Sequence, residues 1–568
     1  MSNKISSSTD YRHGFYVFAC ACAVFSISLL NGFALDDLIH IVQNPKIQNS
    51  AVWARLFLEP SYPGNLFRPL TNFTYALTYE YFALWPLPYH LTNILLHAAV
   101  SSLLYVLLKR IGFDSIAFVV ALLFAVHPLH VEAVANVSGR AELLAAFFGV
   151  LSLLFFQDGC TPSASTARRS IVFCISAGCL LLAALSKESA LVFIGLAFLI
   201  VSLQQREFKK SLPGLFTLTG AALIFLLWRY LALGSIAAAT GETELLDNPL
   251  LGIGAFQRIL VALALLGKYA VLCVLPVPLS ADYSFAVIDT QNFWASLQAW
   301  LNLLVALLLL CVVALTFRRK PTRAFLVAWF FVAFAITANI LFPIGTIFGE
   351  RLAYVPSLGI IGALVLTLKE SLSRRVSVFV LCALGGLYAC QTFFYSAVWH
   401  DNATLYGYQV TVSETSAKTL ANYATVLRNK GKLDEASLYY RRALQIYPRF
   451  ANAAFGIGSV YGKKGAYSGA EHWYHEAISI DPSHAASREA LGRLYVNAGK
   501  FDDAREQFNA ILTRDPQSLP ARIGLFALAL QEGKLEEAKR LRAQLTGEAL
   551  GDPDFQNLDA RLTASLKQ

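Results

Sequence analysis

The sequence predicts an all-α protein in two parts, a multispan bundle of transmembrane helices at 1–400 and an α-solenoid of repeated helix pairs at 401–568. Hydrophobic residues make up 56% of the 568 residues and charged residues only 15%, against roughly 25% charged residues in an ordinary soluble domain. The first 400 residues hold 43 charges and the last 168 hold 40. The third observation is a 34-residue period that begins at Ala417. A single soluble domain is therefore excluded.

Stretches of about 20 mostly apolar residues, the length that crosses the hydrocarbon core of a bilayer, recur through the first part. We expect eleven spans, at 14–31, 89–108, 114–131, 141–157, 170–186, 189–204, 212–233, 294–316, 324–342, 352–369 and 376–397. A further apolar stretch, 256–276, does not fit their alternation, so we interpret it as a re-entrant or interfacial helix. The first outer loop, 32–88, mixes aromatic and charged residues, which is typical of helices in the membrane interface.

Basic residues indicate the orientation of the bundle. Groups such as Lys109 with Arg110, Arg168 with Arg169, and 318–320 fall in alternate loops, which the positive-inside rule places in the cytoplasm. The formal net charge of +9 therefore follows from topology and does not indicate nucleic acid as a partner. An odd number of spans places the second part outside, in the periplasm, the cell exterior or a lumen. The nine cysteines lie in or beside the apolar part and imply no disulfide framework.

The second part contains three strong repeats and a degenerate fourth, which we interpret as a cap. The repeats are 417–450, 451–484, 485–518 and 519–552, with glycine 34 residues apart at 431, 465, 499 and 533. Small and aromatic residues also recur at fixed positions, as in helix pairs that touch closely. Repeats of this kind bind extended peptides or other proteins, so we expect capture of a protein partner or substrate. A spacer or a dimerisation module is the alternative.

Two adjacent acids, Asp36 and Asp37, end the first span and open the outer loop. A carboxylate at this place can accept a proton from an incoming hydroxyl, and its neighbour can orient it or raise its pKa. The same pair can equally mark the outer end of a helix. Arg68, later in this loop, belongs either to a site or to a structural cap on the bundle.

The segment HPLHVEAVANVSGRAELL places His127, His130, Glu132 and Arg140 at the outer end of the third predicted span. The His/His/Glu set could suggest a metal. However, the spacing is not a recognised ligand pattern and Pro128 breaks the helix phase. We therefore expect these residues to form a polar pocket wall and expect no metal.

Two further charged groups lie at outer span ends. Lys187 and Glu188, in LSKES, occupy a tight turn, where a local ion pair between them is the structural alternative to a role in a site. Glu350, Arg351 and Tyr354, in FGERLAYVPS, lie at a membrane boundary. A guanidinium there suits bidentate binding of a phosphate that remains anchored in lipid, with a snorkelling anchor as the alternative.

In this order, the diacidic loop, RPLTNFTYAL, HPLHVEAVANVSGRAELLAA, LSKES, VLPVPLSADYSF, GERLAYVPS and the 34-residue repeats form a specific combination. Over nearly its whole length the chain resembles the transmembrane and tetratricopeptide repeat-containing O-mannosyltransferases. The resemblance implies a type C glycosyltransferase, a multispan helical enzyme that uses a polyprenyl-phosphate sugar on the non-cytoplasmic side. It also implies that Asp36 or Asp37 deprotonates a Ser or Thr hydroxyl of an acceptor protein.

In the mechanism that this resemblance implies, Arg351 holds the lipid phosphate, with Arg140 or Lys187 as a second cation, and the anomeric centre is inverted. The remaining residues of the implied pocket are Arg68, His127, His130, Glu132, Glu188, Glu350 and Tyr354. No cofactor is expected, because the leaving group carries a single phosphate that cations can neutralise, although some type C enzymes use divalent ions.

The chain has far fewer repeats than the members of that family, and its compact form indicates a prokaryotic protein. The donor lipid would then be undecaprenyl phosphate, and the site would face the periplasm from the inner membrane. In a eukaryote the donor would be dolichyl phosphate and the site would face the lumen of the endoplasmic reticulum. Two alternatives remain at this stage, a non-catalytic scaffold that recruits proteins through its repeats, and a transporter or lipid flippase.

Overall fold

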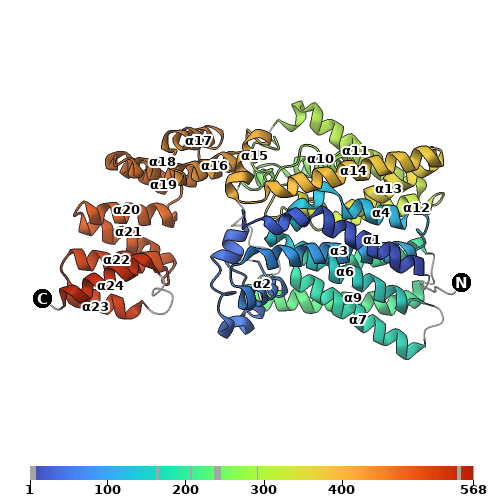
Figure 1. Cartoon of the computed structure of the whole chain (residues 1–568), viewed down its shortest axis with the longest axis horizontal. Coiled ribbons are helices and arrows are strands. Elements are labelled where there is room, and N and C mark those ends of the chain that lie inside the picture. Colours follow the sequence, from blue (N-terminus) through green and yellow to red (C-terminus); the bar gives the residue numbers. More distant parts are fainter. Residues whose placement is uncertain are drawn as a thin grey trace. The chain divides into compact units, whose positions relative to one another are not determined.

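A computed structural model describes residues 8–64, 66–161, 165–204, 208–235, 245–290, 292–545 and 552–566. The described residues form helices and only two isolated β-bridges, so the all-α prediction is confirmed (Figure 1). The chain divides into two compact units, Met1–Ser413 and Glu414–Gln568. The sequence had placed this division at residue 400. The helix α15 (Asn402–Val412) lies in the first unit, where Ser280 Oγ donates a hydrogen bond of 2.6 Å to Gln409.

The first unit is a bundle of long apolar helices joined by short helical turns. Its α-helices are α1 (Ser8–Val24), α2 (Pro69–Phe82), α3 (Pro86–Arg110), α4 (Ala117–Ala125), α5 (Val131–Val134), α6 (Arg140–Gly159), α7 (Thr166–Ser186), α8 (Val192–Leu203), α9 (Phe208–Leu233), α10 (Ala255–Leu272), α11 (Leu297–Thr316), α12 (Pro321–Phe334), α13 (Ser357–Ser371), α14 (Arg374–Val398) and α15. Helix α3 packs between α1 and α6 (Figure 1), and α7 packs against both α6 and α9.

Seven helices of the described part are long and apolar enough to cross a membrane, or eight if the bent pair Ala117–Ala125 and Pro128–Val134 is one span. Sequence windows alone had suggested eleven spans. The difference arises because several predicted spans, such as 14–31 and 324–342, contain helices of only 14 to 17 residues followed by 3-10 turns or irregular chain. Only 17% of the residues in the apolar stretches of α11 and α14 are buried, as expected for helices that face lipid.

Helix α10 has the length and apolarity of a span, although the sequence suggested a re-entrant or interfacial helix. The ends of α8 and α11 line one pocket, so both helices finish at the same end of the bundle. Helix α9 starts near this end, just after α8, and runs back to the opposite end of the bundle. Helix α11 also starts at that opposite end, because its last residues lie at the pocket. The chain between α9 and α11 therefore makes no net crossing. A Cβ atom on Gly267 would overlap the Asn302 carbonyl, so the backbones of α10 and α11 touch.

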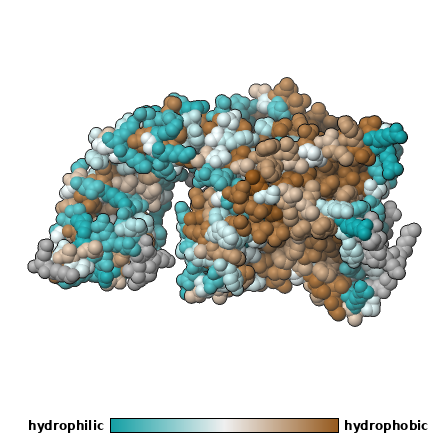
Figure 2. All heavy atoms as spheres, viewed as in Figure 1, coloured by the Kyte–Doolittle hydropathy of each residue, from teal (hydrophilic) through white to brown (hydrophobic). Residues whose placement is uncertain are grey.

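The surface of the first unit matches this architecture. On the face shown in Figure 2, hydrophobic side chains form a broad continuous band over the helices, and hydrophilic side chains gather at the helix ends. The repeat unit is largely hydrophilic in the same view. Large side chains such as Leu231 and Leu315 are 73% and 75% exposed, which is costly in water but suits a hydrocarbon environment. We conclude that the first unit is a multi-pass membrane domain.

The second unit consists of antiparallel helix pairs that follow the predicted 34-residue repeats. They are α16 (Ala417–Asn429) with α17 (Leu433–Ile446), α18 (Ala451–Lys463) with α19 (Tyr467–Ile480), α20 (Ala485–Asn497) with α21 (Phe501–Arg514), and α22 (Leu519–Gln531) with α23 (Leu535–Gln544), followed by α24 (Pro553–Ser565). The four recurring glycines join the helices of each pair at φ between +71° and +77°, a conformation that favours glycine. Residues 546–551 of the predicted fourth repeat lie outside the described part.

Candidate functional site

A cluster of carboxylates and cations lies where several helices of the membrane domain end. Arg351, in the turn Glu350–Ala353 before α13, forms ion pairs of 3.2 Å with both Asp36 and Glu132, through its Nη1 atom. The Arg351 backbone N–H also donates to Glu132 at 2.9 Å. The structure thus brings together predicted residues that are 315 positions apart in the chain.

The two adjacent acids have different environments. The Asp37 side chain is 1% exposed and accepts hydrogen bonds from the backbone N–H groups of Ala34, Val137 and Ser138, at 3.4, 3.2 and 2.7 Å. Burial raises the pKa of Asp37 to about 7, although these three hydrogen bonds favour its ionised form. The Asp36 side chain is 38% exposed and pairs with Arg351. Asp37 therefore fixes the backbone of the site, and Asp36 is the acid that an incoming molecule can reach.

Lys187 and Glu188 do not form the local ion pair that the sequence allowed. Lys187 is buried and pairs instead with Glu142, at the start of α6. Glu188 forms two hydrogen bonds with Arg68, from Nε at 3.1 Å and from Nη2 at 2.8 Å. The backbone at Lys187 is extended after α7, so neighbouring side chains point in different directions and reach different partners. Both pairs tie separate segments together beside the Arg351 cluster.

The pKa of Lys187 reflects nearby charges of both signs. Burial lowers this pKa, the Glu142 carboxylate opposes the shift, and the nearby charges of Arg68 and Arg351 lower it further. Lys187, Arg68 and Arg351 therefore belong to one region of the domain. Each of the three cations is paired with at least one carboxylate, so the region carries fixed charges of both signs.

Arg140, predicted as a second phosphate-binding cation, lies in the core with an exposure of 0%. Its Nε donates to Asn93 Oδ1 at 3.0 Å and its Nη2 donates to the Tyr89 carbonyl at 3.0 Å, while Nη1 contacts oxygens of Thr74. Its guanidinium also lies 4.7 Å from the centroid of the Tyr75 ring. All three guanidinium nitrogens are thus engaged by the protein, so we leave Arg140 out of the proposed phosphate site.

The predicted pocket residues His127, His130 and Tyr354 form a buried network instead of lining an open surface. His130 Nε2 lies 2.9 Å from Ser357 Oγ, and His127 Nε2 lies 3.1 Å from the Cys273 carbonyl. The Tyr354 hydroxyl lies 2.7 Å from the Nδ1 atom of His97. These contacts join α3, the turn before α5, α13 and the end of α10, and they hold the helix ends that carry Glu132 and Arg351.

Glu350 is also fully buried, and burial raises its pKa well above the usual range. Its Oε1 atom accepts hydrogen bonds from the Ser280 backbone at 2.5 Å and from the Tyr283 hydroxyl at 2.7 Å. Glu350 therefore anchors the loop after α10 to the turn that presents Arg351. Its role is to position that turn.

Two residues of the cluster were missed in the sequence. His40 donates its backbone N–H to the Asp36 carbonyl at 2.9 Å, and Asp36 and Arg351 both influence its pKa, which burial lowers. A spacing of four residues, which places side chains on one helical face, could have identified it. Glu142 could have been found because it lies two positions after Arg140 in the same motif. In the described part of the chain, no group of three or more His, Cys, Asp or Glu residues is arranged to hold a metal ion.

Comparison with known protein families identifies the repeats. Families described as tetratricopeptide repeat match residues 424–485, 463–517 and 498–562. A solved tetratricopeptide repeat protein from Parabacteroides merdae ATCC 43184 is 22% identical, covers 32% of this chain and 70% of its own, and has a TM-score of 0.26.

Comparison with curated proteins extends into the membrane domain. A protein O-mannosyl-transferase of Caenorhabditis elegans is 29% identical over 441 residues, covering 75% of this chain and 61% of that protein. The protein O-mannosyl-transferases TMTC3 and TMTC1 of Homo sapiens are each 27% identical, covering 76% and 78% of this chain and 51% and 56% of their own. This chain thus spans about half to three fifths of the length of these curated relatives. The resemblance inferred from the motifs is confirmed, and the chain is a homologue of the TMTC protein O-mannosyl-transferases.

Proposed function

We propose that this protein is a membrane glycosyltransferase that transfers mannose from a polyprenyl-phosphate donor to Ser or Thr hydroxyls of proteins. The reaction takes place on the extracytoplasmic side and inverts the anomeric centre. The names of the relatives support mannose and a protein acceptor. The observation that carries the proposal is the half-exposed Asp36 carboxylate held against the Arg351 guanidinium at 3.2 Å.

Asp36 has the properties of a general base. Its carboxylate is reachable from solvent and held by a cation. It also follows the short 3-10 turn Ser26–Leu30 at the end of the first apolar segment. An ionised carboxylate within hydrogen-bond reach of a hydroxyl can accept its proton as that oxygen becomes a nucleophile. Asp37 is only 1% exposed and accepts three backbone hydrogen bonds, so an incoming hydroxyl does not reach it in this structure.

Arg351 has the properties of a phosphate ligand. A guanidinium carries five N–H donors, and both carboxylate contacts of Arg351 use the single Nη1 atom. Its remaining N–H groups can present a bidentate edge to a phosphate. Lys187 and Arg68 are each held by a carboxylate, Glu142 and Glu188, so we assign the leaving phosphate to Arg351 alone.

The proposed reaction balances in one displacement step. The acceptor hydroxyl gives its proton to Asp36, and its oxygen forms the new bond to the anomeric carbon of the donor. The bond between that carbon and the phosphate oxygen breaks, and the polyprenyl phosphate leaves with both bonding electrons towards Arg351. Attack from the side opposite to the leaving group inverts the anomeric centre. The donor carries one phosphate, so we propose that no resident metal is needed.

The repeat unit supplies the protein-binding part of the proposal. Tetratricopeptide repeats match almost all of its described length, and repeats of this architecture offer extended concave surfaces to partners. We propose that the repeats capture the acceptor protein. The competing function is a scaffold that recruits proteins without transferring sugar.

The test uses the full-length protein in detergent with radiolabelled polyprenyl-phosphate mannose and a Ser/Thr-rich acceptor protein. We expect label on the acceptor, and a loss of about 10²-fold or more with Asp36→Asn, the range for a general base. The matched control is Glu59→Gln, which removes an acid of the same loop that pairs with Lys46 outside the cluster. This control should retain transfer, and so should addition of EDTA.

Other outcomes would redirect the proposal. Transfer of glucose but not mannose would correct the sugar and keep the enzyme. Absence of transfer with every polyprenyl-phosphate sugar, together with acceptor binding that depends on residues 417–545, would favour the scaffold.

A further inference from the structure

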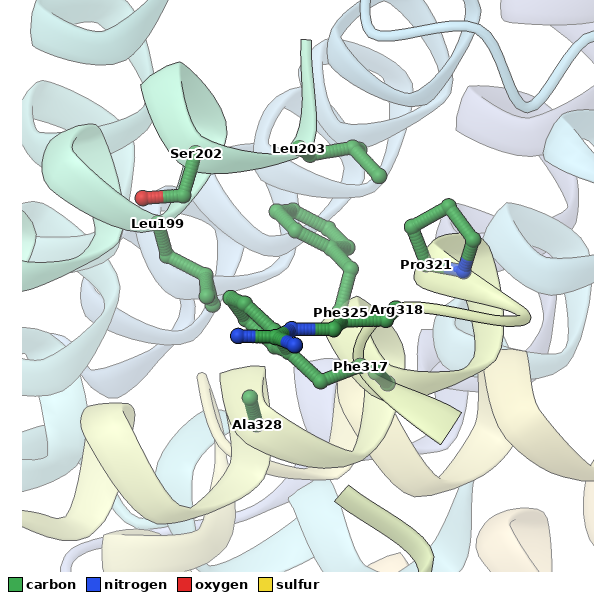
Figure 3. Close-up of a pocket in the computed structure, with 9 residues that line it drawn as sticks. Leu199, Ser202, Leu203, Phe317, Arg318, Pro321, Phe325 and Ala328 are labelled. Carbon is green, nitrogen blue, oxygen red and sulfur yellow. The ribbon is translucent and has the colours of Figure 1, made fainter. Parts of the chain in front are cut away.

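A pocket of about 190 Å³ opens at the end of the bundle opposite the charged cluster. It lies between the C-terminal end of α8 and the turn that joins α11 to α12. Figure 3 shows Leu199 and Leu203 on one side, Phe317 and Phe325 on the other, and the Arg318 guanidinium projecting between them. The remaining lining residues are Ser202, Pro321, Ala324 and Ala328.

The course of helix α8 separates this pocket from the proposed active site. Helix α8 begins just after Glu188, which belongs to the charged cluster, and ends at Leu203 in the pocket. Its 12 residues correspond to about 18 Å along the helix axis. The pocket therefore lies towards the other end of the bundle, the end that the basic residues predict to be cytoplasmic.

The lining combines an apolar wall with a single cation. Seven of the nine lining residues are apolar, and no acidic residue lines the pocket in the described part of the chain. The neighbouring basic residue Arg323 pairs with Glu370, outside this lining. Arg318 is exposed and carries its charge at the mouth of the pocket. A ligand that fits must therefore be amphiphilic, with an anionic group next to an apolar chain.

We infer that this pocket binds an anionic phospholipid of the surrounding membrane. The phosphate accepts hydrogen bonds from Arg318, and the upper part of one acyl chain packs on Phe317, Phe325 and Leu199. The Ser202 hydroxyl donates to the Phe198 carbonyl at 3.0 Å and takes no part in this contact. Basic pockets between transmembrane helices near the cytoplasmic side are established binding sites for anionic headgroups. The exposed side chains next to the pocket, Phe198 at 50% and Leu315 at 75%, provide apolar surface for the rest of the lipid.

A bilayer phospholipid fits this place better than the proposed sugar donor. The donor phosphate must lie within contact of Arg351, about the length of α8 away, for Asp36 to act on its sugar. A structural phospholipid needs no such access. It would stabilise the ends of α8, α11 and α12 at the membrane boundary.

Native mass spectrometry of the full-length protein in detergent tests this inference, with phosphatidylglycerol and phosphatidylcholine of identical acyl chains as probes. We expect phosphatidylglycerol to bind about fivefold more tightly, the effect of one basic residue at an anionic surface. Arg318→Gln should remove this preference. The matched control, Arg319→Gln, removes one positive charge at the next residue, which does not line the pocket. This control should change the dissociation constant less than twofold. Ala328→Phe, which fills the pocket, should weaken binding of both lipids.

Three results would overturn the inference. Equal effects of Arg318→Gln and Arg319→Gln would show a diffuse surface charge and no site. Unchanged binding with Ala328→Phe would place the lipid elsewhere. If Ala328→Phe fails to fold, Arg318→Gln still provides a test, because Arg318 is exposed. Displacement of phosphatidylglycerol by polyprenyl phosphate at equal concentration would assign the pocket to the donor lipid. Sugar transfer by the Arg318→Gln variant is measured separately, so failure here would not affect the proposed enzyme function.

Discussion

Substitution of the buried acid Asp37 tests the different roles of the two neighbouring aspartates. The pKa of Asp37 is about 3.9 in an unfolded chain, and burial raises it to about 7 in the folded protein. The folded state therefore binds this proton more tightly than the unfolded state. The stability that Asp37 contributes is complete below about pH 4 and is lost as the pH rises through 7.

The size of this stability change follows from the pH range between the pKa values of Asp37 in the unfolded and folded states. One proton held by the folded state alone changes the free energy of unfolding by about 1.4 kcal/mol per pH unit. Between pH 5 and pH 7 the protein should therefore lose about 2 to 3 kcal/mol through Asp37. Asparagine resembles the protonated acid in shape but does not titrate, so Asp37→Asn should abolish this part of the slope.

The assay is unfolding of the purified protein in detergent, at half-unit steps from pH 5 to pH 8, with the two proteins measured in parallel. The difference between the wild type and Asp37→Asn should fall by about 2 to 3 kcal/mol over two pH units. The control Glu59→Gln should leave the slope unchanged, because the hydrogen bond from Lys46 lowers the pKa of Glu59 and keeps it below this window. Parallel curves for the wild type and Asp37→Asn would refute the assignment of Asp37 as a buried, proton-binding backbone acceptor.

Three further substitutions test the packing of the site and the repeats. Arg351→Gln should lower the free energy of unfolding by about 3 kcal/mol, because it leaves the buried Glu132 carboxylate without its cation, and unchanged stability in detergent would refute the pairing. Arg140→Gln should also lower the yield of folded protein, whereas an altered KM for the donor at unchanged stability would return Arg140 to the phosphate site. Tyr474→Ala should lower the free energy of unfolding of the repeat unit by about 3 kcal/mol, measured by circular dichroism, since its ring fills the space beside Gly458; a change below 1 kcal/mol would contradict that packing.

The fold class and the repeats could be predicted because both depend on periodic patterns within short windows. The glycine spacing predicted turns that need positive φ, and the structure has them at Gly431 and its three counterparts. The number of spans could not be predicted equally well. Hydropathy detects an apolar window but not the break in a helix, as in the bent pair Ala117–Ala125 and Pro128–Val134.

The candidate site could be predicted as a set of residues but not as a set of partners. Asp36, Glu132 and Arg351 were all identified, yet their contacts join segments that are far apart in the chain. The local ion pair with Glu188, one of the two alternatives for Lys187, does not form, because its partner Glu142 lies on a neighbouring helix. A charged residue beside a span has the same appearance in sequence whether it faces a cavity or is held in the core.

The distinction between Asp36 and Asp37 depended entirely on the structure. Adjacent residues at a helix end point in directions about 100° apart, so only one of them was expected to face a cavity. The backbone hydrogen bonds at Val137 and Ser138 identify Asp37 as the buried one. No pattern in one sequence contains this information.

The most direct test of the central claim compares single-turnover sugar transfer by Asp36→Asn and Asp37→Asn, each corrected for the fraction of folded protein. We predict that Asp36→Asn lowers the rate by about 10²-fold to 10⁴-fold, the contribution of a general base. Asp37→Asn should retain a rate within about tenfold of the wild type once its folded fraction is taken into account. Equal, partial losses from the two substitutions would contradict the assignment of Asp36 as the single base.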